Sequence, residues 1–259
     1  MAEPRETWHL NTARVGRRVL VFDQLESTNT TAASLALQAD DDTDGLAIAA
    51  GFQTAGRGQY GRVWHSRPGR SLLLSVIFRP PQELSRPVVL TACTAVAVGD
   101  AVLALTGAQA KVKWPNDLLV RGKKVCGILI EQHAATAIIG IGLNLNQTAD
   151  EFAEAGLPDA ASLTQVSGGG FEPRTAAEVV LRRLDREYDR LLTGERVAVE
   201  ADWKWRVGLL GRPVAVELTD GTTLSGRLRE MGFDGLELDT GELLPRLILP
   251  ETVRNLRAE

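Results

Sequence analysis

The spacing of hydrophobic and polar residues along the chain predicts many strands with few helices between them. Short apolar or alternating segments bounded by Gly, Pro, Asn or Asp are typical of strands. The predicted strands cover residues 17–25, 45–53, 70–80, 110–132 (three strands separated by two turns) and 136–146. Because strands mostly follow strands, the pattern favours an α+β fold, a mixed central sheet with flanking helices, over regular α/β alternation.

Three other segments have a helical pattern. Residues 27–40 are alanine-rich and begin with residues that favour an N-cap, and residues 175–194 carry an apolar stripe at helical spacing. Residues 88–105 are long and apolar enough for a membrane span, but Asp100 and the many alanines fit a buried core helix better. We therefore expect no membrane segment. The acidic run at 40–44 is expected to be a solvated loop.

The pattern changes near Gly208. From there on, short strands are separated by Asp-Gly and Thr-Gly pairs, which are typical of hairpin turns. This predicts a small C-terminal β-barrel. The predicted parts are thus a loose N-terminal arm at 1–18, a large α+β domain at 19–207 and the barrel at 208–259.

Composition restricts the partners and the compartment. The 259 residues are 44% hydrophobic and carry a formal net charge of −4, which gives no general electrostatic reason to bind nucleic acid or an acidic membrane. The two cysteines, Cys93 and Cys126, lie in apolar segments, and the chain does not start with an apolar signal segment. We therefore expect a cytoplasmic protein. The three histidines have no metal-ligand spacing with either cysteine, so no structural metal is expected.

The stretch QTAGRGQYGRVWHS at 53–66 is the most unusual in the chain. Its residues 56–61 match the G-x-G-x-x-G dinucleotide fingerprint, but that function requires a helix to open inside the motif and an acidic residue to end the next strand. Trp64 and Pro68 follow instead, and the next strand ends in Arg-Pro-Pro. Arginines interleaved with glycines favour an anion-binding loop over a plain linker, because the glycines let backbone amides approach an anion closely.

Three more segments carry candidate chemistry, although each has an ordinary structural explanation on its own. KWPNDLL at 113–119 places a cation, an aromatic ring, an amide and a carboxylate at one turn, which could also be a surface turn. Lys124 lies in GKKVCGILIE, where paired lysines are often solvated. Gly140 and Gly142 lie within a strand, where glycine weakens the sheet unless something approaches the backbone closely.

Taken in order, these segments resemble the biotin protein ligase family. No single block is specific, but together they are. The blocks are Ser27-Thr28-Asn29, Gln53-Thr54-Ala55-Gly56-Arg57-Gly58, Gly61-Arg62-x-Trp64, Lys113-Trp114-Pro115-Asn116-Asp117, Lys124-x-x-Gly127-Ile128-Leu129 and Gly140-x-Gly142-x-Asn144. GRPV at 211–214 and the β-rich tail are similar to the SH3-like C-terminal domain of that family.

The resemblance implies a class II synthetase-like catalytic domain and a two-step ligation. Biotin and Mg-ATP would give biotinyl-5'-adenylate and pyrophosphate, and biotin would then pass to one lysine of a biotin carboxyl carrier domain. ATP and Mg²⁺ are the implied cofactors. Family members often dimerise through the central sheet, which leaves a homodimer open.

The resemblance also implies the site residues. Lys124 would stabilise charge on the carboxylate and phosphate oxygens, Arg57 would hold the carboxylate side, and Asp117 is our hypothesis for the group that deprotonates the carrier lysine. The implied biotin-binding residues are Ser27, Thr28, Asn29, Gln53, Gly56, Arg57, Gly58, Lys124, Gly127, Leu129, Gly140 and Gly142. The implied ATP-binding residues are Arg62, Trp64 (packing on adenine), Lys113, Asn116, Asp117 and Asn144.

Two departures from the family pattern change the expectation. Gln59 stands where many family loops have arginine, so we expect a leakier adenylate unless Arg62 or Arg70 compensates. About 18 residues precede the first predicted strand, too few for the DNA-binding helix-turn-helix of bifunctional members, so a monofunctional ligase that does not bind DNA is expected.

Two other functions stay open. The first is a lipoate or octanoate ligase on the related fold, which the Gly-Arg-Gly loop and KWPNDL fit less well. The second is a non-catalytic biotin-responsive regulator. It would need a DNA-binding segment or the loss of Lys124, and the sequence shows neither.

Overall fold

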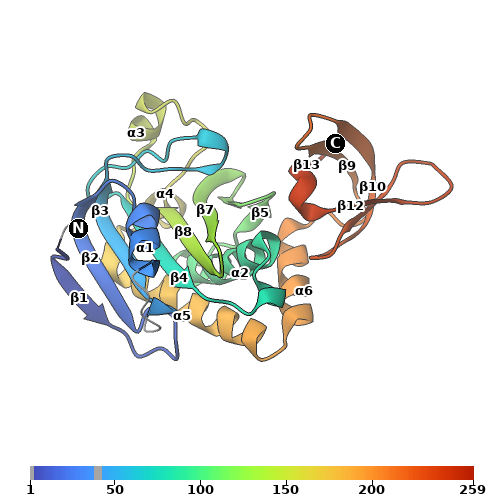
Figure 1. Ribbon diagram of the computed structural model, residues 1–259. Helices are drawn as coiled ribbons and strands as arrows, with labels where there is room; N and C mark the ends of the chain where they lie inside the picture. Colours follow the sequence, from blue (N-terminus) through green and yellow to red (C-terminus); the bar gives the residue numbers. More distant parts are fainter. Residues whose placement is uncertain (1–2, 38–42) are drawn as a thin grey trace.

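The computed structural model describes residues 3–37 and 43–259, which form two sheets and six α-helices (Figure 1), besides short 3₁₀ turns. The strands of the larger sheet are β1 (Glu6–His9), β2 (Arg18–Leu25), β3 (Ala47–Gln53), β4 (Ser71–Phe78), β5 (Lys111–Lys113), β6 (Asp117–Val120), β7 (Lys123–His133) and β8 (Thr136–Asn144). Those of the smaller sheet are β9 (Pro213–Leu218), β10 (Thr223–Met231), β11 (Leu236–Asp239), β12 (Arg246–Ile248) and β13 (Val253–Ala258). The helices are α1 (Thr28–Ala36), α2 (Pro87–Thr106), α3 (Ala149–Glu154), α4 (Leu163–Ser167), α5 (Pro173–Leu192) and α6 (Arg196–Val207).

The larger sheet is mixed, as the sequence predicts. Its strand order is β1-β2-β3-β4-β8-β7-β6-β5. Strands β2 and β3 pair in parallel and are joined through α1, whereas β3 with β4, β4 with β8 and β8 with β7 pair antiparallel. The smaller sheet is antiparallel in the order β12-β11-β10-β9-β13, and its turns fall at the Asp-Gly and Thr-Gly pairs that the sequence marks. The α+β class is therefore confirmed.

The two faces of the larger sheet have different covers. Helices α2 and α5 pack on one face, and α1 packs on part of the other (Figure 1). Helix α2 is the one helix in the described part of the chain that is long and apolar enough to cross a membrane, but 72% of its apolar window is buried inside the protein. It is a core helix, as predicted, and the face that α1 leaves open remains available for a site.

A run of aromatic side chains joins the two sheets. The ring centroids of Trp114 and Trp203 are 5.6 Å apart, and those of Trp203 and Phe233 are 5.7 Å apart. Trp114 belongs to the turn after β5, Trp203 to α6 and Phe233 to the smaller sheet's β10–β11 turn. Because these rings are buried in one continuous core, the smaller sheet has a fixed position beside the larger one.

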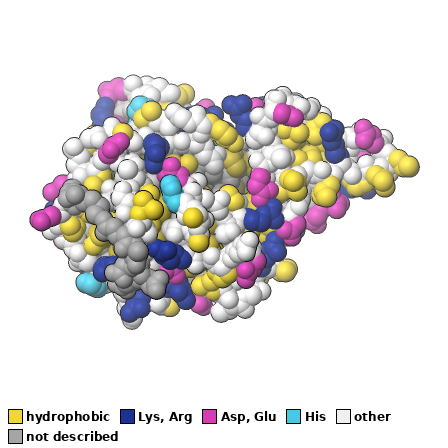
Figure 2. Space-filling view, in the orientation of Figure 1, with side chains coloured by type: hydrophobic (Ala, Val, Ile, Leu, Met, Phe, Trp, Pro, Cys, Tyr) yellow, Lys and Arg dark blue, Asp and Glu magenta, His cyan; other side chains and the backbone are white. Residues whose placement is uncertain are grey.

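Figure 2 shows lysine and arginine side chains interspersed with aspartate and glutamate over the visible face. This distribution agrees with the small net charge of −4. Mixed signs of this kind do not produce the single-sign field that concentrates polyanions at a surface.

The structure corrects several expectations. The arm predicted at 1–18 is not loose, because β1 pairs antiparallel with β2 and Trp8 is buried. The helices α3, α4 and α6 were not predicted from the sequence. Of the acidic run at 40–44, residues 40–42 lie outside the described part. Asp44 is not simply solvated, since it accepts a hydrogen bond from the backbone N–H of Arg79 at 2.9 Å.

Candidate active site

A cavity of about 660 Å³ lies on the open face of the larger sheet. This volume is in the range of small-molecule sites. Every residue that the sequence predicts for the site lines the cavity, with the exception of Gly56. Segments that are far apart in the chain, the 53–66 loop, the 113–117 turn, Lys124 and the glycines of β8, therefore meet at one place.

The face on which each β7 side chain lies is set by a bulge. Leu118 pairs with Cys126 and Leu119 pairs with Lys124, so Val125 is an extra residue in the ladder. In a regular strand, Lys124 and Gly127 would lie on opposite faces because they are three residues apart. The extra residue changes this alternation, and both Lys124 and Gly127 line the cavity.

Glycines form the floor of the cavity, and the indole of Trp64 covers them. A Cβ atom added at Gly142 would lie 2.5 Å from Cε2 of Trp64, and one added at Gly127 would lie 3.0 Å from its Cζ3. Larger residues at these two strand positions would displace the indole. The indole N–H is buried and has no protein acceptor among the described residues. The sequence placed Trp64 with the nucleotide, but here it lies on glycines assigned to the biotin pocket.

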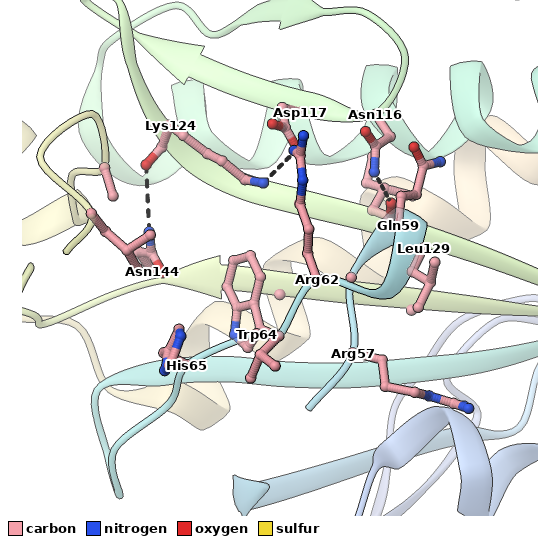
Figure 3. A pocket seen from close by; sticks show the side chains of 18 of the residues that line it. Arg57, Gln59, Arg62, Trp64, His65, Asn116, Asp117, Lys124, Leu129 and Asn144 are labelled. Carbon is pink, nitrogen blue, oxygen red and sulfur yellow. Dashed lines mark hydrogen bonds and ion pairs between the residues drawn. The ribbon is translucent and has the colours of Figure 1, made fainter. Parts of the chain in front are cut away.

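Lys124 and Asp117 form an ion pair inside the cavity (Figure 3), with Nζ 2.6 Å from Oδ1. Lys124 is further fixed through its backbone, which donates to the carbonyl of Asp159 at 2.8 Å and accepts from the N–H of Ala161 at 2.9 Å. The lysine side chain is one-third exposed and the aspartate 16% exposed. A cation held this way can act on an anionic oxygen in a partly desolvated site.

The end of the cavity beside α1 is polar. The backbone N–H and Oγ1 of Thr28 both donate to Oε1 of Gln53, at 2.7 and 2.9 Å. The hydroxyl of Ser75 lies 2.6 Å from Oδ1 of Asn29, and that asparagine donates through Nδ2 to Glu131 at 2.7 Å. Gly140 is required beneath this group, because a Cβ atom there would lie 2.4 Å from Oδ1 of Asn29.

Arg57 points away from the Lys124–Asp117 pair (Figure 3). Its Nη2 lies 3.0 Å from Oε2 of Glu131 and 3.3 Å from Oγ1 of Thr30. The three predicted catalytic residues are thus not together. Lys124 and Asp117 form an ion pair, whereas Arg57 is bound to Glu131 near the polar end. A role of Arg57 on the substrate carboxylate stays a prediction.

The loop at 53–66 is a small hairpin rather than the start of a helix. Arg57 bridges to Val63 in antiparallel fashion, the N–H of Gly58 donates to the carbonyl of Arg62 at 2.8 Å, and the N–H of Trp64 donates to that of Gly56 at 2.9 Å. Tyr60 stands at its tip with a left-handed φ of 57°. This geometry agrees with rejecting a dinucleotide fold.

Besides Trp64 and Asp117, the predicted nucleotide residues fall into two groups. Lys113 and Arg62 are exposed cations on the cavity wall. Asn116 donates to the carbonyl of Ile128 at 2.6 Å, and Asn144 donates to that of Ala161 at 3.1 Å, so these two amides already stabilise the walls. Their contact with a nucleotide stays a prediction.

Arg70, which the sequence offered as a replacement for the missing loop arginine, does not line the cavity. Its Nε lies 3.2 Å from Oε1 of Glu151, and its Nη1 donates to the carbonyl of Asn146 at 3.1 Å. Arg62 remains the better candidate within the loop.

Sequence reasoning missed Ser75 and Glu131, which hydrogen-bond the lining residue Asn29 from outside the cavity, and several residues of the lining itself. Ser75 had a visible signal, a hydroxyl in the otherwise apolar strand SLLLSVIF, and Glu131 is a charge late in a mostly apolar strand. The 156–160 loop gave no signal. The smaller sheet contributes Glu217, Arg254 and Asn255 to the lining, although the sequence assigned it no site residue.

The cysteines take no part in the site. Cys93 and Cys126 are fully buried and unbonded, and burial raises the pKa of both thiols, so neither is a nucleophile. Within residues 3–37 and 43–259, no three His, Cys, Asp or Glu side chains are grouped so that they could hold a metal ion.

The fold and the cavity define a class of protein, the biotin ligases. The biotin protein ligase of Aquifex aeolicus in complex with biotin and ATP matches with a TM-score of 0.77 and 25% identity, over 93% of this chain and 99% of that one. The Leishmania major ligase with biotinyl-5-AMP matches with a TM-score of 0.54 and 25% identity, over 80% of this chain and 97% of that one.

Sequence comparison assigns the family. The model of the biotin/lipoate A/B protein ligase family matches residues 21–146. The bifunctional ligase/repressor BirA of Bacillus spizizenii is 34% identical over 94% of this chain and 74% of its own length. The biotin--[acetyl-CoA-carboxylase] ligase of Mycobacterium tuberculosis is 33% identical over 85% of this chain and 84% of its own length. The chain belongs to this family.

Proposed function

We propose that the protein is a biotin protein ligase, which activates biotin with ATP and transfers it to a lysine of a biotin carboxyl carrier domain. One observation carries the proposal: the glycine loop, the KWPND turn, Lys124 and the strand glycines, which are dispersed in the sequence, line a single cavity of about 660 Å³. In the first step, a biotin carboxylate oxygen would attack the α-phosphorus of ATP, and pyrophosphate would leave.

The polarity of the cavity suggests how biotin would lie. The ureido group has donors and acceptors that suit the hydrogen-bonding groups of Ser27–Asn29 and Gln53, and its carboxylate would then point toward Lys124. Lys124 would stabilise the negative charge that develops on the carboxylate and α-phosphate oxygens. The triphosphate would meet the exposed cations Lys113 and Arg62.

The cavity also suits Mg²⁺ bound with ATP. Magnesium in nucleotide sites is commonly held by one or two carboxylates together with phosphate oxygens. Asp117, Asp159 and Glu217 line the cavity and are the carboxylates available for this. When bound, the ion would supply charge neutralisation for the triphosphate.

In the second step, the carrier lysine needs a neutral amine. An unperturbed lysine has a pKa near 10.4, so neutrality at pH 7 costs roughly 4–5 kcal/mol. We assign the proton acceptance to Asp117, which already binds an ammonium group, that of Lys124, at 2.6 Å. The amine nitrogen would then attack the acyl carbon, and AMP would leave.

Asp117→Asn tests this assignment. We expect adenylate formation to persist while carrier transfer slows by about 10²–10⁴-fold, the usual contribution of a general base. Single-turnover transfer from preformed adenylate measures the second step alone, and Asp150→Asn, an exposed carboxylate outside the cavity, is the control. Equal loss in both steps would assign Asp117 to nucleotide or magnesium binding instead.

A lipoate or octanoate ligase is the other candidate, and the polar end of the cavity disfavours it. A site built to hydrogen-bond its substrate rejects an analogue without those groups by about 10⁴-fold or more, because its buried polar groups lose their partners. Ser27, Thr28 and Asn29 are buried at this end. The dithiolane of lipoate and the alkyl end of octanoate offer them no matching partners.

Pyrophosphate exchange into ATP tests the function directly. The purified chain with magnesium and no carrier should exchange pyrophosphate with biotin and not with lipoate or octanoate. Exchange with lipoate would assign the protein to the other branch of the family, and failure with all three acids would refute the ligase proposal.

The remaining parts of the proposal concern organisation. We propose that residues 19–207 bind biotin and ATP, that residues 208–259 form a barrel domain, and that the protein works in the cytoplasm without binding DNA. The buried free thiols and the net charge of −4 support the last two points. A homodimer through the central sheet is also proposed. Light scattering would measure it.

A further inference from the structure

Strand β13 of the smaller sheet contains a bulge at the cavity. Val253 pairs with Leu218 and Asn255 pairs with Glu217, so Arg254 is an extra residue in the ladder. The alternation changes accordingly: Val253 and Leu256 are both buried, although they are three residues apart. Bulges of this kind often redirect a side chain beside an active site, and Arg254 lines the cavity.

The redirected side chain meets the tip of the glycine loop. The guanidinium carbon of Arg254 lies 5.3 Å from the ring centroid of Tyr60, within the range of a cation–π contact. Tyr60 is the non-glycine residue that the hairpin holds at φ 57°, a conformation that is unfavourable without external support. The contact therefore joins Tyr60, whose backbone conformation is unfavourable, to the smaller sheet.

The bulge itself is held in place from the catalytic side. The indole N–H of Trp114 donates to the carbonyl of Val253 at 2.9 Å, and Trp114 is buried against Trp203. Arg254 thus follows Val253, which is hydrogen-bonded to Trp114 of the KWPND turn. Glu217 is an anionic neighbour of the guanidinium, with its Oε1 3.7 Å from Nε of Arg254. This is long for a hydrogen-bonded ion pair, so it leaves the Tyr60 contact in place.

We propose that Arg254 is a positioning residue that holds the glycine loop closed over the acyl-adenylate through the ring of Tyr60. The inference rests on the proposed ligase function. Arg254 would also substitute for the loop arginine whose place Gln59 takes. The cation then comes from the smaller sheet and contacts Tyr60, the residue after Gln59. Retention of the intermediate would then depend on both sheets.

The test measures release of biotinyl-adenylate from the full chain in the absence of any carrier. A cation–π contact at an exposed site is worth about 0.5–1 kcal/mol, so Arg254→Ala should speed release by about two- to fivefold. Tyr60→Leu should do the same, and the double variant should release no faster than either single one. Tyr60→Phe, which keeps the ring, should release at the wild-type rate.

Arg246→Ala is the matched control, since Arg246 is exposed on the far edge strand of the same sheet and does not line the cavity. Biotin-driven pyrophosphate exchange by the wild-type chain establishes the ligase function separately. The inference is overturned if exchange is intact but Arg254→Ala releases the adenylate no faster than Arg246→Ala. It is also overturned if the effects of Arg254→Ala and Tyr60→Leu are additive, because the two residues would then act independently.

Discussion

Replacing Lys124 by methionine removes the cation of the cavity while keeping an unbranched side chain of similar length. The ammonium lies 2.6 Å from Asp117 and within 5.7 Å of the Trp64 ring centroid. If Lys124 stabilises the charge that forms when biotin attacks ATP, the variant should lose adenylate formation. It should keep the fold, because the strand and its bulge are held by backbone hydrogen bonds.

The two effects differ enough in size to be separated. Removing one preorganised group that stabilises transition-state charge costs about 10²–10³-fold, or roughly 2.7–4 kcal/mol. The ion pair is partly exposed, at 33% for the lysine and 16% for the aspartate, so its contribution to stability is screened and amounts to about 1 kcal/mol or less. For a chain of this length, that is a melting shift of no more than about 4 °C.

Pyrophosphate exchange at saturating biotin and ATP measures the first effect, and thermal unfolding measures the second. Lys123→Met is the matched control, because Lys123 is the preceding lysine on the same strand, is exposed and does not line the cavity. Exchange by Lys124→Met within about threefold of wild type would refute the electrostatic role, since the loss of such a group costs at least ~10²-fold. Equal losses in the two variants would refute it as well.

Two further outcomes follow from the packing. In Gly142→Ala, the new Cβ atom would lie 2.5 Å from the Trp64 ring, so tryptophan fluorescence should change and biotin-driven exchange should fall. Gly169→Ala, with open space around it, should alter neither, and an unchanged Gly142→Ala spectrum would contradict the packing. The second outcome concerns pH. Burial raises the pKa of both thiols in the folded chain, so the unfolded chain loses these protons at a lower pH. The free energy of unfolding should therefore fall as pH rises above the unfolded thiol pKa of about 8.5. The fall should be at most about 1.4 kcal/mol per pH unit for each thiol. Denaturation at pH 8 and 10 measures this, and replacing both cysteines with alanine should reduce the slope; an unchanged slope would show that the thiols are not its cause.

The sequence predicted the contents of the site better than its geometry. Glycines in a strand and a glycine–arginine loop are local signals, and both predicted residues that line the cavity. What the sequence could not supply is register, because strand pairing is set by contacts between distant segments. Ser75 pairs with Gly140 across β4 and β8, which explains why a lone hydroxyl in an apolar strand contributes to the polar end.

The misses have a related cause. Strand β1 has four residues, too few to establish an alternating pattern, and it is stabilised by pairing with β2. Helix α6 presents Val199, Trp203 and Val207 at spacings of four, a signal that was available but short. Its position matters for function, because Trp203 is the ring that joins Trp114 to the smaller sheet.

The two bulges show why spacing alone could not place the functional cations. A regular β7 would align Lys124 with Cys126 and Ile128, which face the core beneath α2, and an ammonium buried there without a partner would cost several kcal/mol. The extra residue Val125 puts the lysine side chain on the cavity face, where it forms the ion pair with Asp117. The bulge in β13 likewise makes Arg254 an extra residue between the paired residues Val253 and Asn255, so its side chain can lie at the cavity. Both cations reach the site because a ladder gains one residue, and that feature exists only once the strands have paired.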